Sequence, residues 1–260
     1  MRWARFERNG DISYGIVDGS DIEVVKGDLF GSHEKTGERV ALDAVKLLVP
    51  FEPKTFYAAG LNYVDHIKEQ AAMHGRELNI PQKADIGYRA NNALIAHDEN
   101  VIVPKDATEN VQYEAEIVAV IGKQAKHLSE ADALSCVFGY TIGNDVSERT
   151  WQKNDRTFWR AKNTDTFKPM GPWIETELDL DSLKTTVRMD GEVTIEFPTN
   201  NMLFSIEKYI SEMTRYLTLY PGDMIWMGTE GSSPNVKDGA VVEIEISQIG
   251  TLRNRFVREK

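Results

Sequence analysis

Residues 111–122, VQYEAEIVAVIG, form a strand-like segment in which two carboxylates interrupt an otherwise apolar pattern. Successive side chains of a β-strand point to opposite faces, so Glu114 and Glu116 share one face, which continues into Val118 and Val120. Holding two ionised carboxylates together away from water is unfavourable unless a cation compensates. Carboxylate oxygens suit Mg²⁺, Mn²⁺ or Ca²⁺. The segment therefore predicts a buried strand that carries part of a metal site, and the alternative is a strand end that reaches water.

A second Glu-x-Glu, in residues 241–247 (VVEIEIS), provides an internal comparison. There Glu243 and Glu245 alternate strictly with apolar residues, which is typical of a strand with one face in solvent. We therefore expect no metal site at that pair.

A third carboxylate, Asp145, ends the apolar run YTIGND at residues 140–145. If this run lies beside residues 111–122 in a sheet, Asp145 can face Glu114 and Glu116 and complete an open Mg²⁺ site. The alternative is that Asp145 only caps the helical turn that follows it.

Two further motifs carry candidate catalytic groups. His66 and Glu69 lie three residues apart in YVDHIKEQ, on one face of an expected helix. A histidine held by a carboxylate can act as a general base on water, although exposed pairs of this kind are common. Lys162, in FWRAKNTDTFKPMGP, could bind a carboxylate or stabilise an oxyanion, and the alternative is a solvated surface lysine.

Composition excludes several classes of protein. The 260 residues carry a formal net charge of −11, which disfavours a protein that tracks nucleic-acid phosphates. Cys136 is the only cysteine, so no disulfide framework can form. The sequence has no apolar stretch near the length of a membrane span and no signal peptide. We therefore expect a soluble, cytoplasmic protein without a nucleic-acid or membrane partner.

The pattern along the chain predicts two domains. Residues 1–52 contain short strand-like runs separated by Asn-Gly and Asp-Gly turns, which indicate a small N-terminal antiparallel, β-rich domain. Residues 53–260 would form the larger domain, and their strands do not alternate regularly with long helices. We therefore expect an α+β, mainly β fold. The polar residues 66–85 lack a sustained apolar stripe and are expected to form a mobile lid.

Taken in order, six motifs resemble the fumarylacetoacetate hydrolase family: GLNYVDHIKEQ, YEAEIVAVIGK, GYTIGNDVSERTWQ, AKNTDTFKPMGP, EMTRYLTLYPGDMIWMGT and the terminal strands. The similarity runs from about residue 55 to residue 257. It implies a mixed β-roll catalytic domain, a homodimer and a site for Mg²⁺ or Mn²⁺, in which Ca²⁺ can substitute.

The resemblance also implies roles for individual residues. Three carboxylates match the metal ligands of the family: Glu114, Glu116 and Asp145. Three residues match its catalytic groups, namely a dyad and an active-site lysine: His66, Glu69 and Lys162. Three more match positions that line the substrate pocket or the Gly-Thr-Pro turn: Arg149, Gln152 and Thr229.

The chain departs from the family pattern at several positions. Many members have Phe-x-Lys before the metal strand, where this sequence offers Tyr88 and Arg89. Glu230 replaces the usual Pro after Thr229, and Lys168 follows DTF, where small residues are frequent. These changes leave the expected metal ligands in place and affect the identity of the substrate.

The function implied by the resemblance is hydrolysis of a carbon–carbon bond in an acylpyruvate-like β-diketo 2-oxo acid. Water activated by His66, oriented by Glu69, would attack the distal carbonyl while Lys162 stabilises the oxyanion. The alternative within the family is isomerisation, decarboxylation or hydration of a 2-oxo diacid from aromatic ring cleavage. An alternative of another class is a catalytically silent metal-binding relative with a structural role.

Overall fold

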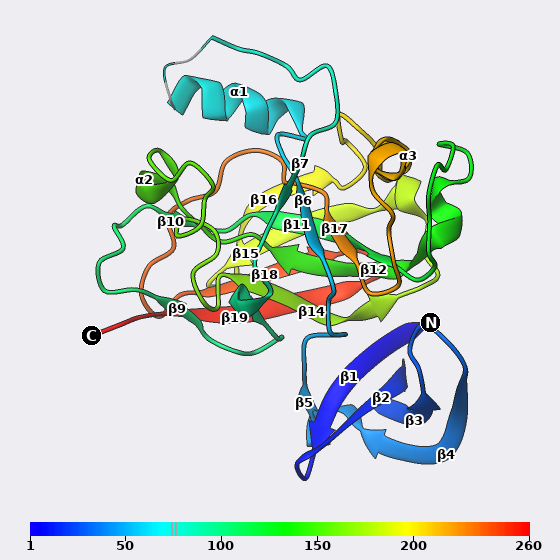
Figure 1. Cartoon of the computed structure of the whole chain (residues 1–260). Helices are drawn as coiled ribbons and strands as arrows, with labels where there is room; N and C mark the ends of the chain where they lie inside the picture. Colours follow the sequence, from blue (N-terminus) through cyan, green and yellow to red (C-terminus); the bar gives the residue numbers. More distant parts are fainter. Residues whose placement is uncertain (74, 76) are drawn as a thin grey trace.

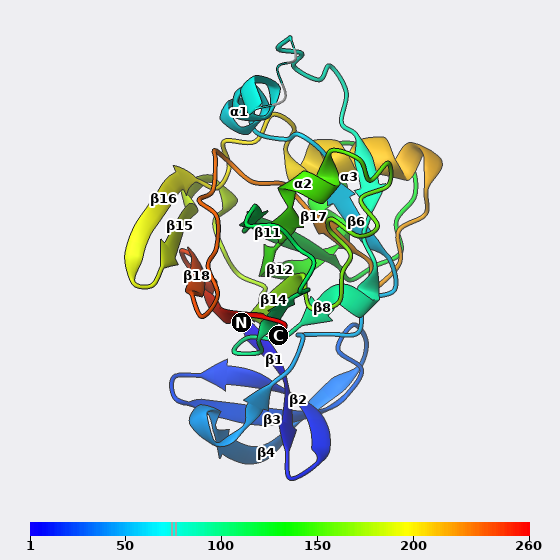
Figure 2. The same cartoon turned by 90° about the vertical axis from the view of Figure 1, so that its left-hand side faces the viewer.

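The computed structural model describes residues 1–73, 75 and 77–260 (Figure 1). His74 and Arg76, which belong to the segment expected to form a lid, lie outside the described residues. The N-terminal strands lie at one end of the molecule and helix α1 (Val64–Met73) at the other, as both views show (Figure 1, Figure 2).

The N-terminal part consists of five strands and one short 3₁₀ helix: β1 (Arg2–Arg8), β2 (Asp11–Asp18), β3 (Asp21–Gly27), β4 (His33–Ala41), η1 (Leu42–Ala44) and β5 (Lys46–Leu47). The pairs β1–β2, β2–β3 and β3–β4 are antiparallel. Asn9 and Gly10 connect β1 to β2 with φ of 54° and 89°, the left-handed geometry that a tight hairpin turn requires. The antiparallel pairing matches the expectation, and the boundary at residue 52 stays a prediction.

A twelve-stranded mixed sheet runs through the molecule, because β1 also pairs with β14. Its other strands are β6 (Phe56–Ala59), β7 (Ile86–Tyr88), β8 (Leu94–Ile95), β11 (Ala115–Ile121), β12 (Val137–Asn144), β14 (Lys168–Glu175) and β17 (Met224–Trp226). The strand order from the N-terminal part onward is β1-β14-β12-β11-β17-β6-β7. Strands β11, β12 and β14, which carry the candidate site, are therefore neighbours in the sheet.

A five-stranded sheet packs against this one, in the order β16-β15-β18-β19-β9. Its strands are β9 (Val101–Val103), β15 (Lys184–Met189), β16 (Glu192–Pro198), β18 (Val241–Ile246) and β19 (Gly250–Arg258). A short ribbon pairs β10 (Val111–Gln112) with β13 (Ser147–Glu148). Glu243 and Glu245 are partly exposed on β18 and alternate with buried residues, as the sequence predicts.

Both faces of β11 are buried, which explains its continuous apolar pattern. Ile117 and Ala119 belong to a core cluster that includes side chains of the five-stranded sheet. Val118 and Val120 pack on the opposite face, in a cluster with Trp226. The carboxylates next to Val118 therefore lie on a face that the protein interior covers.

The described part of the chain outside residues 1–52 contains few helices: α1, α2 (Arg149–Gln152), α3 (Ile206–Tyr216), η2 (Asn91–Ala93), η3 (Ala133–Cys136) and η4 (Leu180–Ser182). The expected α+β, mainly β class, with mixed sheets, is confirmed. Within the described part of the chain, none of the helices has the length and apolar character that crossing a membrane requires.

Candidate metal centre and active site

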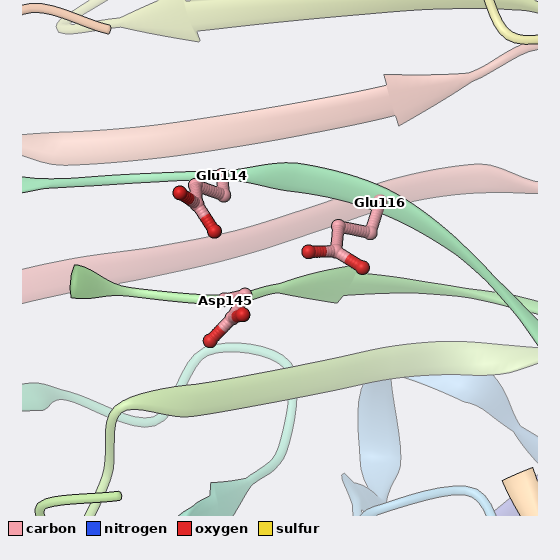
Figure 3. A group of neighbouring side chains, drawn as sticks. All are labelled: Glu114, Glu116 and Asp145. Carbon is pink, nitrogen blue, oxygen red and sulfur yellow. The ribbon is translucent and has the colours of Figure 1, made fainter. Parts of the chain in front are cut away.

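Three carboxyl groups meet where β11 begins and β12 ends (Figure 3). Glu116 lies opposite Gly143 in the antiparallel β11–β12 ladder, and the amide of Asp145 donates to the carbonyl of Glu114 at 2.9 Å. Each of Glu114, Glu116 and Asp145 offers an oxygen atom, and these oxygens lie within 4.8 Å of one another. All three side chains are buried. The structure thus brings together the three residues expected to bind a metal.

Two cationic side chains contact Glu114. Its Oε2 lies 2.5 Å from Lys162 Nζ, and its Oε1 lies 2.7 Å from Arg149 Nη1. Lys162 Nζ also lies 3.0 Å from Asp145 Oδ2, so its ammonium group sits between two carboxylates. Burial alone would raise the pKa of Glu114, but Lys162 and Arg149 outweigh it and lower the pKa to about 2.

Asp145 is contacted by three cations. Besides Lys162, Arg89 Nη2 lies 3.0 Å from Oδ2, and Lys168 Nζ lies 2.7 Å from Oδ1. Burial opposes ionisation of this carboxyl group, but Arg89, Lys162 and Lys168 together hold its pKa well below the usual range. Asp145 is therefore a carboxylate in the metal-free protein.

Glu116 differs from both neighbours. It accepts a hydrogen bond from the amide of Gly228 at 2.8 Å, and no cationic side chain among the described residues pairs with it. Burial, followed by the charges of Asp145 and Glu114, raises its pKa to about 8. Glu116 is therefore the carboxyl group of the cluster that is left without a cationic partner among the described residues. Three buried carboxylates are a donor set that fits a hard divalent ion.

His66, on α1, is 8% exposed and faces the acidic cluster. Its Nδ1 lies 2.6 Å from the carbonyl oxygen of Gly231, and its Nε2 lies 3.9 Å from Glu114 Oε1. A carbonyl oxygen can only accept, so Nδ1 donates this hydrogen bond. The bond fixes the orientation of the ring and turns Nε2 toward the carboxylates.

Glu69 lies one turn further along α1 and is half-buried. Burial raises the pKa of Glu69, and the nearby His66 and a hydrogen bond from Ser232 lower it by less. Its Oε2 has no hydrogen-bond partner within the described part of the chain. The backbone carbonyl of Gly231, not Glu69, accepts from His66, so the orienting role of Glu69 stays a prediction.

The expected substrate-binding residues lie at the rim of the cluster. Arg149 donates through Nη1 to Gln152 Oε1 at 2.9 Å, so both side chains lie beside Glu114. Thr229 is buried and directly follows Gly228, whose amide donates a hydrogen bond to Glu116. Contact of these residues with a substrate stays a prediction.

Sequence patterns missed several groups of this site. Arg89 and Lys168 were recognised only as departures from the family pattern, although a lysine in the apolar run DTFKPMGP was a signal of a buried charge. The amide of Gly228 and the carbonyl of Gly231 gave no signal, because every residue carries these groups. A separate groove of about 800 Å³, next to Leu47 of the N-terminal part, contains none of the expected site residues.

Residues 55–257 match the family model described as "Fumarylacetoacetate (FAA) hydrolase C-terminal", and residues 1–50 match "Rv2993c-like, N-terminal". The crystal structure of 2-hydroxyhepta-2,4-diene-1,7-dioate isomerase from Mycobacterium marinum is 31% identical, with a TM-score of 0.89 over 100% of this chain and 99% of that one.

Two further proteins are similar to this chain. "Oxaloacetate tautomerase Fahd2a, mitochondrial" of Rattus norvegicus is 33% identical over 84% of this chain and 74% of its own length. Maleylpyruvate hydrolase from Sphingobium sp. SYK-6, solved with manganese(II) and pyruvate, is 24% identical, with a TM-score of 0.79 over 100% of both chains. This last likeness concerns the fold alone.

Proposed function

The chain belongs to the fumarylacetoacetate hydrolase family, and on this premise we propose that it is a divalent-metal-dependent enzyme that moves a proton on a 2-oxo acid. The reaction that we put first is keto–enol isomerisation of a 2-oxo diacid. The observation that carries the proposal is the orientation of His66, whose Nδ1 donates to the carbonyl of Gly231 and whose Nε2 faces the acidic cluster.

In this proposal Glu114, Glu116 and Asp145 hold Mg²⁺ or Mn²⁺, with Ca²⁺ as a substitute. A cation there would polarise the keto group of a 2-oxo acid and so acidify the neighbouring C–H bond. Lys162 and Arg149, which contact Glu114 in the structure, would turn to the carboxylate groups of the substrate. Charge-assisted hydrogen bonds from these two cations would orient the substrate before the proton moves.

His66 would then act as the general base. Its Nε2 removes a proton from the carbon next to the keto group, and the oxygen of that group takes up a proton, so the keto form becomes the enol. The reverse sequence returns the proton to carbon. One base with a fixed orientation is sufficient for this reaction, and relatives named isomerase and tautomerase at 31% and 33% identity support it.

The second candidate is hydrolytic cleavage of the carbon–carbon bond of an acylpyruvate. The buried Oε2 of Glu69 favours it, because this oxygen lies one turn from His66, has no hydrogen-bond partner among the described residues and could hold a water molecule. His66 would take a proton from that water, and the resulting hydroxide would add to the distal carbonyl of the substrate. The carbon–carbon bond between this carbonyl and the pyruvate unit would then break. The carbon of the pyruvate unit would take up the proton from His66, giving a carboxylic acid and pyruvate.

A small panel of substrates distinguishes these reactions. We propose assaying oxaloacetate, an acylpyruvate and an unsaturated 2-oxo diacid with the purified protein and Mg²⁺ or Mn²⁺, with a chelator as the control. Faster keto–enol conversion without release of pyruvate supports isomerisation, and stoichiometric pyruvate from the acylpyruvate supports hydrolysis. Inactivity of a folded, metal-binding protein on all three would instead favour the catalytically silent relative.

A further inference from the structure

Lys168 is a buried charge that the proposed chemistry does not use. It is the first residue of β14, and its side chain is 0% exposed. Its Nζ lies 2.7 Å from Asp145 Oδ1 and donates to the carbonyls of Phe167 at 2.8 Å and Val146 at 3.0 Å. An ammonium group has three N–H donors, so these contacts use all of them. Lys168 therefore has no free donor for a ligand, and it acts on the site through its charge and through Asp145.

The surroundings of Asp145 are crowded with positive charge. Arg89 and Lys162 share this carboxylate with Lys168. With Arg149 on Glu114, four cationic side chains contact a cluster of three carboxyl groups. A divalent ion bound to these carboxyl groups would lie close to all four cations.

The four cations differ in how freely they can move away. Lys162 and Arg149 bind side chains of the cluster and can turn to an incoming anion. Lys168 donates to two backbone carbonyls, so its Nζ stays beside Asp145 when Lys162 and Arg149 turn away. Repulsion between buried like charges is strong because the interior screens them poorly. A ligand with negative charge compensates for this repulsion.

We infer that Lys168 is a positioning residue that weakens the affinity of the carboxylate cluster for a metal ion alone and makes metal binding depend on an anionic 2-oxo acid. This inference rests on the proposed function. Because such coupling is reciprocal, the metal strengthens binding of the acid by the same factor. The protein would therefore fill its site chiefly when substrate is present.

Calorimetric titration with Mn²⁺ at neutral pH tests the inference, with oxalate as a mimic of the 2-oxo acid. For the wild-type protein, saturating oxalate should lower the Kd of Mn²⁺ by about tenfold or more. Lys168→Met should bind Mn²⁺ alone about tenfold more tightly than wild type, with a smaller effect of oxalate. The matched control is Lys184→Met, which removes an exposed lysine paired with Glu196 and should leave both Kd values unchanged.

The outcomes separate the inference from the proposed function. Absence of Mn²⁺ binding with or without oxalate would contradict the metal-dependent function itself. Equal Kd values for wild type with and without oxalate, or no tighter binding of Mn²⁺ alone by Lys168→Met, would overturn the role of Lys168. If thermal melting shows that Lys168→Met does not fold, Lys168→Gln takes its place. The comparison of the Kd of Mn²⁺ for the wild-type protein with and without oxalate needs no substitution. Equal values there would overturn the inference even if neither variant folds.

Discussion

Glu116 has the least compensated charge of the three carboxyl groups. Glu114 has two cationic partners, and Asp145 has three. Among the described residues, Glu116 accepts a hydrogen bond only from the amide of Gly228. Its pKa of about 8 in the metal-free protein follows from burial and from the charges of Asp145 and Glu114. A divalent ion must displace the proton that Glu116 holds at neutral pH.

Metal binding should therefore release about one proton at neutral pH. The affinity for Mg²⁺ or Mn²⁺ should rise with pH up to about 8, where Glu116 is ionised without metal, and level off above it. Calorimetry in buffers of different ionisation enthalpy counts the protons released. Binding without proton release would contradict the raised pKa. Replacing Glu243 and Glu245 by Gln is the control and should leave the affinity unchanged.

Residue patterns predicted some groups of this site and missed others for a physical reason. The carboxylates of β11 were recognisable because a solvated strand such as β18 shows strict alternation and β11 does not. Lys168 reaches Asp145 because β14 pairs with β12, and Arg89 reaches it from the end of β7. Such contacts depend on how segments far apart in the sequence pair in the sheet. The alternation of apolar and polar residues along one strand carries no information on its partner.

At the scale of elements, α1 is less firmly packed than α3. The described side chains of α1 include only two that are buried, His66 and Ile67. Four apolar residues on one stripe of α3 are buried: Ile206, Tyr209, Ile210 and Met213. The base thus lies on an element with little apolar area to hold it in place.

We expect α1 to become ordered when a ligand binds. Hydrogen exchange of the amides of residues 64–73, measured with Mg²⁺ and with or without oxalate, should show protection that rises with oxalate. Residues 206–216 are the control, and their protection should not change. Strong protection of α1 without ligand would mean a rigid helix that holds His66 in place permanently, and would contradict a lid.

Strand β1 joins the N-terminal strands to the rest of the twelve-stranded sheet. It pairs with β14 through Arg2 opposite Glu175 and Trp3 opposite Ile174. Trp3 is 2% exposed and belongs to a core cluster that also contains Val118 of the metal strand. The N-terminal sheet therefore continues into the strands that carry the site, which the match of residues 1–50 to a separate family model did not reveal.

Trp3→Ala should lower the free energy of unfolding of the whole chain by about 3–5 kcal/mol, because it empties a shared core. Chemical denaturation followed by tryptophan fluorescence and by circular dichroism should show one transition, shifted to lower denaturant in the variant. Two transitions, of which only one moves, would instead show that residues 1–52 unfold independently.

The assembly of the molecule stays a prediction from the family resemblance. We expect a homodimer in solution, and light scattering coupled to size-exclusion chromatography measures the mass directly. A mass equal to the 29.4 kDa of one chain would contradict the dimer.

The central claim is that His66 moves a proton on a 2-oxo acid at a metal-dependent site. Exchange of deuterium from D₂O into the carbon next to the keto group of a 2-oxo diacid, followed by proton NMR with Mg²⁺, tests it most directly. The wild-type protein should accelerate exchange, and a chelator should abolish it. His66→Ala should slow exchange by about 10²–10⁴-fold while binding Mg²⁺ as wild type does. Exchange at the wild-type rate in His66→Ala, or none above background with the metal-loaded wild-type protein, would contradict the account.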